Sequence, residues 1–230
     1  MNSLIGQPGL ERTSQAFRRA LVAAAQEIGT EPDSLATVIA FESAGSFDSA
    51  KRNPLSACVG LIQFCGPAAI AAASRAGHSM SKEDAQSWLA AMTPEEQLRH
   101  VVGYFLSVSK GKRDLTLEQT YLLVFAPGYA FKDLGAVAYS AGTAAYTQNK
   151  PMDIDQDGRI TVGDIARKIR GKYDAAISRP RVPVEGGSAD VADLATAGVG
   201  GSTSGKYLAI VAGTTLGYYV VSQYVGKRRA

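Results

Sequence analysis

The chain has 230 residues, of which 46% are hydrophobic and 20% are charged, so it can bury a core in one main domain and still carry an appendage. Its formal net charge is +3, but four cations lie after residue 205, in a segment without acidic residues: Lys206, Lys227, Arg228 and Arg229. The remainder carries a charge of −1, which argues against a nucleic-acid-binding surface.

Helical periodicity and helix-capping residues dominate the first 175 residues. The patterns predict a helix over 14–28 that ends at Gly29, then a helix with Thr30 as its N-cap that ends at Gly45. Further helices are predicted over 67–75, from Ser81, over 93–105 and over 116–125. No alternating strand pattern is longer than a few residues. We therefore expect a mainly α-helical domain over residues 1–175.

The helix after Thr30 carries a glutamate on its apolar face. Leu35, Val38, Ile39 and Glu42 follow one another at i, i+3, i+4 and i+7, which places them on one side of the helix. A carboxyl group at the end of such a stripe points toward the core or into a cleft wall, where desolvation raises its pKa and suits it to act as a general acid. The alternative is a buried glutamate held in a structural ion pair.

Two short motifs give this glutamate a context. Residues 42–47 read Glu-Ser-Ala-Gly-Ser-Phe, and residues 60–64 read Gly-Leu-Ile-Gln-Phe, with Pro67 shortly after. In this order and at this separation the motifs resemble those of the soluble lytic transglycosylases, relatives of goose-type lysozyme in the lysozyme superfamily. The likeness is strongest to the phage and prophage members, which often carry a calcium loop after a Tyr-x-x-Asn stretch such as residues 146–149.

The resemblance implies a lysozyme-like helical domain that cleaves the MurNAc-GlcNAc β-1,4 bond of peptidoglycan with formation of a 1,6-anhydro ring. Glu42 would be the single catalytic acid and base, and Ser43 and Gln63 would position Glu42 or bind the substrate. Residues 124–128 read Val-Phe-Ala-Pro-Gly where the family has Ala-Tyr-Asn-Ala-Gly, so no catalytic role is carried over there.

Three alternative functions stay open at this level. A hydrolytic muramidase needs a second carboxylate, and Asp48 is the only one that closely follows Glu42 in the sequence. A structural, membrane-inserting virion protein would carry the catalytic fold incidentally. A calcium-dependent glycan-binding module would carry an inactive site.

Cys58 and Cys65 are the only two cysteines. If the second motif opens a helix, they lie about two turns apart, roughly 10 Å at 1.5 Å per residue. That separation is too long for a disulfide, so both cysteines are predicted to be small buried apolar residues.

Residues 153–164 match the twelve-position EF-hand loop, with Gly158 at the turn position and an aspartate in place of the usual glutamate at the last position. The sequence therefore predicts a structural Ca²⁺ site. Its expected ligands are Asp153, Asp155, Asp157, the Arg159 carbonyl, Thr161 and Asp164.

The C-terminal part changes character. Residues 176–205 are predicted to be a flexible linker, with its Pro-, Gly- and Ser-rich part beginning at Arg179. Residues 206–230 are predicted to form a transmembrane helix over Tyr207–Val225 and a basic tail. Gly213 and Gly217 form a Gly-x-x-x-Gly motif that would support homo-oligomers. Residues 1–8 lack the features of a secretory signal peptide. We therefore expect a virion-associated protein that is anchored in a membrane by its C-terminal helix and acts in the host periplasm or cell wall.

Overall fold

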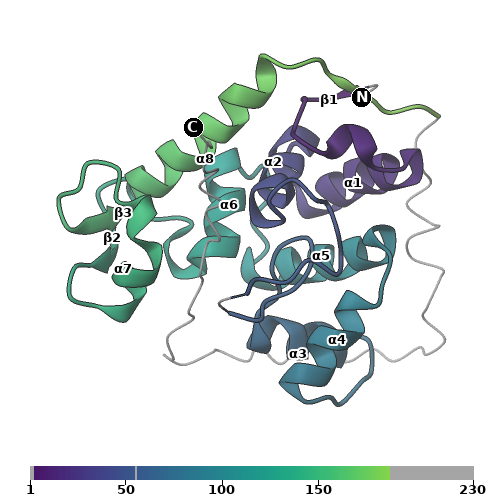
Figure 1. Ribbon diagram of the computed structural model, residues 1–230, viewed down its shortest axis with the longest axis horizontal. Helices are drawn as coiled ribbons and strands as arrows, with labels where there is room; N and C mark the ends of the chain where they lie inside the picture. Colours follow the sequence, from purple (N-terminus) through teal and green to yellow (C-terminus); the bar gives the residue numbers. More distant parts are fainter. Residues whose placement is uncertain (1–2, 55, 187–230) are drawn as a thin grey trace, which may run out of the picture.

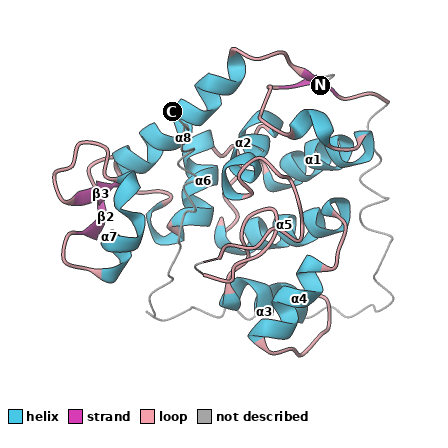
Figure 2. Cartoon of the chain, in the orientation of Figure 1, coloured by secondary structure: helices cyan, strands magenta, loops and turns pink. Residues whose placement is uncertain are grey.

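The computed structural model describes residues 3–54 and 56–186 (Figure 1). These residues form eight α-helices, three short 3₁₀-helices and two small β-ribbons (Figure 2), which confirms the prediction of a mainly α fold. The α-helices are α1 (Gln15–Ile28), α2 (Pro32–Glu42), α3 (Gly66–Arg75), α4 (Lys82–Ala90), α5 (Pro94–Val108), α6 (Leu117–Phe125), α7 (Ala144–Asn149) and α8 (Val162–Ile177). The 3₁₀-helices are η1 (Leu10–Arg12), η2 (Pro127–Tyr129) and η3 (Lys150–Met152), and the strands are β1 (Ser3–Leu4), β2 (Val137–Ser140), β3 (Arg159–Thr161) and β4 (Val182–Pro183).

The helix starts follow their capping residues. The hydroxyls of Ser14, Ser81, Thr93 and Thr116 each accept a hydrogen bond from a backbone N–H of the first turn, as preferred N-cap residues do. The expected cap of α2 was wrong by one residue. Its N-cap is Glu31, because the hydroxyl of Thr30 instead bonds to Thr120 on α6, at 2.8 Å between the oxygens.

Helix α2 lies at the centre of the molecule and packs against α1, α6 and α8 (Figure 1). Leu35, Val38 and Ile39 of its apolar stripe have no exposed surface. Helices α3 and α4 pack against each other below α5, while the ribbon of β2 and β3 lies with α7 at the far end of α8 (Figure 1).

The two ends of the described fold meet in an antiparallel pair, β1 with β4. Asp33 of α2 supports this junction, because its carboxylate accepts the backbone N–H of Ile5 at 2.9 Å and the guanidinium of Arg181 at 3.0 Å. The folded part thus extends beyond the predicted boundary at residue 175. Helix α8 continues to Ile177, and the segment after it is fixed by strand pairing and by the bond from Arg181.

The predicted membrane segment Tyr207–Val225, the glycines 213 and 217 and most of the predicted linker lie outside the described residues. Within 3–54 and 56–186, no helix has both the length and the apolar character needed to cross a bilayer.

Candidate active site and metal loop

Glu42 is the last residue of α2, so its side chain stands where the helix leaves the core. The residue is partly exposed, while the surrounding protein desolvates its carboxyl group and raises the pKa from 4.5 to about 8. No ion pair or hydrogen bond to this carboxyl group is found among the described residues, and no neighbouring charge contributes to the shift. The structural ion pair considered from the sequence is therefore absent from this part of the chain. Glu42 is held protonated near neutral pH, the state that a general acid needs.

Tyr121 of α6 accompanies Glu42. Its side chain has no exposed surface, and its hydroxyl is buried without a hydrogen-bond partner among the described residues. Burial raises the pKa of Tyr121, and the charge of Glu42 raises it further, so the two groups lie within electrostatic reach of each other. The ring of Phe41 meets the Tyr121 ring edge-on at 5.2 Å between centroids, and Phe125 stacks on it at 5.6 Å.

Ser43 shapes the turn that follows Glu42. It is fully buried, and its hydroxyl accepts the backbone N–H of Phe47 at 3.1 Å. The backbone then passes through positive φ at Ala44, Gly45 and Phe47, a conformation that ends helices abruptly. The structure therefore places Ser43 as a support of the turn that sets the position of Glu42; a contact with substrate stays a prediction.

The second motif forms a tight hairpin before α3. The backbones of Val59 and Phe64 exchange two hydrogen bonds, at 3.2 and 2.7 Å, and Gly60 and Gln63 both have positive φ. The Gln63 side chain donates to the carbonyls of Gly60 at 2.9 Å and Lys51 at 3.2 Å. Gln63 is thus placed as a brace of the loop, and its predicted contact with substrate is also open.

Gln97 of α5, which the sequence did not single out, holds this hairpin against the body of the protein. Its side chain is fully buried. It accepts the backbone N–H of Leu61 at 2.7 Å and donates to the carbonyls of Ser49 and Leu89, at 3.1 and 2.8 Å. One amide group therefore connects both motif loops to two helices of the lower region.

The prediction that Cys58 and Cys65 are unpaired was wrong. They form a disulfide, with 4.3 Å between their Cα atoms. The prediction assumed that the second motif opens a helix, whereas α3 begins only at Gly66 and the hairpin reverses the chain. The reversal brings together two residues that a helix would have separated by about two turns.

Asp48, the candidate second carboxylate, stabilises its own turn. The side chain of this exposed residue accepts the backbone N–H of Ala50 at 2.8 Å. No interaction between Asp48 and Glu42 is present in the described part of the chain.

The predicted calcium loop brings three of its aspartates together. Ligand oxygens of Asp153, Asp155 and Asp157 lie within 4.8 Å of one another. Asp153 is 7% exposed, and one of its carboxylate oxygens is buried without a partner. Its other oxygen accepts the hydroxyl of Tyr146 at 2.6 Å and the N–H of Gly158 at 3.1 Å. An unpaired buried carboxylate oxygen beside two other carboxylates fits a hard divalent cation.

Asp164 is not part of this cluster, whereas the predicted roles of Thr161 and the Arg159 carbonyl stay predictions. Asp164 is buried and caps α8, because its carboxylate accepts the N–H and the hydroxyl of Thr161 at 2.9 and 2.5 Å. Arg167 donates to Asp164 and lies 3.7 Å from a carboxylate oxygen of Asp155. Arg159 lies in β3, opposite Ser140.

Comparison with known proteins adds no assignment: no protein family, no curated protein and no solved structure matches the chain.

Proposed function

We propose that this protein is a peptidoglycan-cleaving enzyme of the lytic transglycosylase type with a lysozyme-like helical domain, and that Glu42 is its only catalytic acid and base. In the proposed reaction, protonated Glu42 gives its proton to the glycosidic oxygen as the bond from the muramic acid C1 breaks. The resulting carboxylate then accepts the proton of the muramic acid 6-hydroxyl, whose oxygen bonds to C1. Glu42 ends the cycle protonated, and no water is consumed.

One observation carries this proposal: Glu42 ends the apolar stripe of α2 with its carboxyl group free of any ion pair among the described residues. Desolvation at this position raises the pKa of Glu42 to about 8. A general acid that is protonated at neutral pH is what glycosidic bond cleavage needs. The motifs around Glu42 and in the second loop resemble those of the transglycosylases, and in the structure the second loop is fixed by side-chain amides, those of Gln63 and Gln97.

The single-glutamate reaction is proposed because the motifs around Glu42 resemble those of enzymes that use one glutamate. Two-carboxylate glycosidases hold their acid and their base or nucleophile on opposite sides of the scissile bond, about 5–10 Å apart. No described carboxylate perturbs Glu42, and Asp48 is engaged in its own turn. We therefore propose chemistry in which one glutamate serves twice, and the reaction products distinguish it from hydrolysis.

The buried Tyr121 hydroxyl fits a supporting role in the same site. Among the described residues it is the one buried hydroxyl without a hydrogen-bond partner. The charge of Glu42 raises the pKa of Tyr121, so the two groups interact electrostatically. A hydrogen bond from Tyr121 to the ionised form of Glu42, or to the sugar, would satisfy it during the reaction.

We further propose that Asp153, Asp155 and Asp157 hold a structural Ca²⁺. The ion would neutralise three carboxylates that repel one another and give the buried oxygen of Asp153 a partner. It would stabilise the ribbon of β2 and β3 at the end of α8.

The test of the enzymatic proposal is digestion of purified peptidoglycan by the full chain, with the products identified by mass spectrometry. We expect 1,6-anhydro ends, and Glu42→Gln is expected to lose activity by on the order of a hundredfold or more. Glu27→Gln is the matched control, because Glu27 is an exposed glutamate on α1.

The products separate the outcomes. Reducing ends without anhydro ends would show a hydrolytic muramidase that uses the same fold. Digestion by Glu42→Gln at the parental rate would remove Glu42 from the chemistry, and no digestion by the parent would leave a binding or structural role.

A further inference from the structure

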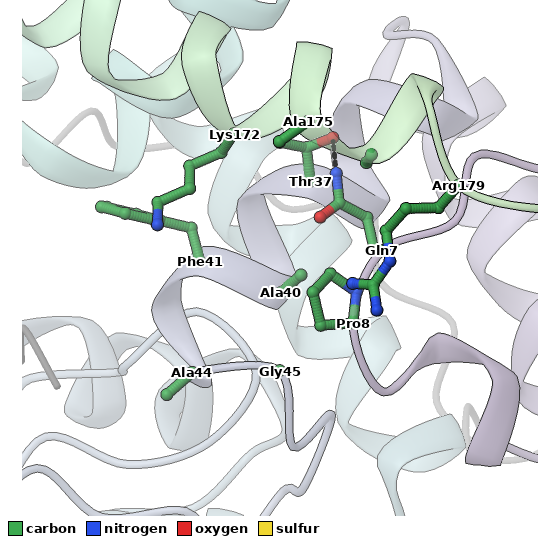
Figure 3. A pocket seen from close by; sticks show the side chains of 11 residues that line it. Gln7, Pro8, Thr37, Ala40, Phe41, Ala44, Gly45, Lys172, Ala175 and Arg179 are labelled. Atoms are coloured by element: carbon green, nitrogen blue, oxygen red, sulfur yellow. Dashed lines mark hydrogen bonds between the residues drawn. The ribbon is translucent and has the colours of Figure 1, made fainter. Parts of the chain in front are cut away.

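A pocket of about 330 Å³ lies on the side of α2 that faces α8 and the N-terminal segment. Figure 3 shows the space enclosed between these three elements. Ala40 and Phe41 line it from α2 and Ala44 from the turn after that helix, while Lys172 and Ala175 line it from α8 and Arg179 from the segment that follows. The volume falls within the range of small-molecule sites, about 300–1,000 Å³. Alanines along both helices keep the space open, because their side chains end at Cβ.

Three sets of contacts hold the N-terminal segment against the other walls of the pocket. Gln7 is 3% exposed, and its side-chain nitrogen donates to the hydroxyl of Thr37 at 2.8 Å. Pro8 and Gly9 lie directly on Gly45: a Cβ on Gly9 would come within 1.8 Å of the Gly45 carbonyl oxygen. Together with the bonds of Asp33 to Ile5 and Arg181 described above, these contacts fix the N-terminal segment across the two helices.

The hydroxyl of Thr37 is engaged by Gln7 and by the carbonyl of Asp33, which leaves two cations and the amide oxygen of Gln7 as the polar side-chain groups offered to a ligand. Lys172 and Arg179 are exposed at its mouth, and no described carboxylate pairs with either. The ammonium of Lys172 lies 5.8 Å from the centre of the Phe41 ring. The Gln7 amide directs its nitrogen to Thr37, and Figure 3 shows its oxygen turned toward the space between Phe41 and Pro8.

These groups define the chemistry of a ligand. Two unpaired cations favour a carboxylate, the Gln7 oxygen accepts an N–H, and the alanine walls with Phe41 favour small aliphatic groups. A short acidic peptide with alanine-sized side chains offers all three.

We propose that this pocket binds the stem peptide that peptidoglycan carries on its muramic acid, with a free carboxylate between Lys172 and Arg179. This inference rests on the proposed function, and it makes the peptide-bearing polymer the substrate class. Phe41 and Ala44 of the pocket flank Glu42 in the sequence, so a glycan at Glu42 and its stem in the pocket would lie on two sides of the same helix end. An extended peptide spans about 3.3 Å per residue, enough for a stem of a few residues to pass around the helix.

Binding is measured by calorimetry on full-length Glu42→Gln protein, which the proposal expects not to cleave. The probe is a synthetic acetylated stem tripeptide with free carboxylates. We expect saturable binding that weakens roughly tenfold or more in Lys172→Ala/Arg179→Ala, as for the loss of charge-assisted hydrogen bonds. Ala175→Leu, which fills the mouth without changing the charge, is expected to weaken it as well.

Two controls make the result specific. Lys82→Ala/Lys132→Ala removes the same charge from exposed positions outside the pocket and is expected to leave binding unchanged. The tripeptide with its carboxylates amidated is expected to bind at least about tenfold more weakly. No saturable binding, equal binding of the amidated peptide, or binding insensitive to both pocket variants would overturn the proposal.

The cleavage assay keeps this proposal separate from the enzymatic one. We expect the two pocket variants to cleave peptide-free glycan strands at the parental rate and peptide-bearing peptidoglycan more slowly. If the parent cleaves neither substrate, the proposed function fails, and calorimetry with Glu42→Gln still decides whether the pocket binds the peptide.

Discussion

The raised pKa of Glu42 makes the free energy of unfolding depend on pH, and this can be measured without any substrate. The pKa of a free glutamate is 4.5, whereas that of Glu42 in the folded protein is about 8. Between these values the folded state keeps a proton that the unfolded state releases. This contribution to stability is therefore fully present below pH 4.5 and is lost as pH rises to about 8, by about 1.4 kcal/mol per pH unit.

Glu42→Gln removes this titration and leaves the other ionisable groups in place, so their contributions cancel between variant and parent. The unfolding free energy of the variant minus that of the parent is expected to increase by up to about 5 kcal/mol between pH 4.5 and pH 9, because only the parent loses stability as Glu42 ionises. Urea unfolding at pH 5, 7 and 9 measures it, with Glu27→Gln as the control that should show no such trend. A difference that stays constant with pH would show that the Glu42 carboxyl is solvated, and the argument for a neutral acid would fail.

Three further predictions concern other parts of the site. Ca²⁺ is expected to raise the melting temperature by binding only the folded form, and Asp155→Ala should abolish the rise; equal melting temperatures of the parent with Ca²⁺ and with chelator would contradict it. Reducing the Cys58–Cys65 bond should lower the unfolding free energy by about 2 kcal/mol through the entropy of the opened loop, so an unchanged urea midpoint would argue against the bond. Gln97→Ala should lose on the order of 3 kcal/mol because it leaves buried backbone groups unpaired, whereas Gln26→Ala at an exposed position of α1 should lose almost none.

The features predicted correctly from the sequence are those encoded by neighbouring residues. Helix α1 begins after Ser14 and ends at Gly29 as expected, since its cap residues adjoin an amphipathic stripe. Glu42 lies at the end of α2 for the same reason: the apolar period and Gly45 are both local signals. The three clustered aspartates are also local, because alternate positions of one short loop converge on a single point.

The features that escaped prediction depend on contacts between distant parts of the chain. The hairpin that pairs Cys58 with Cys65 needs positive φ at Gln63, which is not glycine, and it is held by Gln97 from another helix. Tyr121 reaches Glu42 only because α6 packs on α2. Asp164 forms a capping box with Thr161 at the start of α8, an interaction that the calcium-loop pattern did not predict.

The pairing of β1 with β4 has a consequence for how the chain folds during synthesis. Strand β1 is made first, but its partner, Val182–Pro183, follows almost all of the other described residues. Until that partner leaves the ribosome, Asp33 lacks the guanidinium of Arg181, and the segment that carries Gln7 has no strand to hold it in place. The entropic cost of closing a loop rises only slowly with its length. The time before β1 pairs with β4 is therefore set by how long the ribosome takes to synthesise the residues between them. The N-terminal wall of the pocket therefore gains its last supports late, and a chain stopped at Ile177 would contain every candidate catalytic residue but lack Arg179, Arg181 and the strand that pairs with β1.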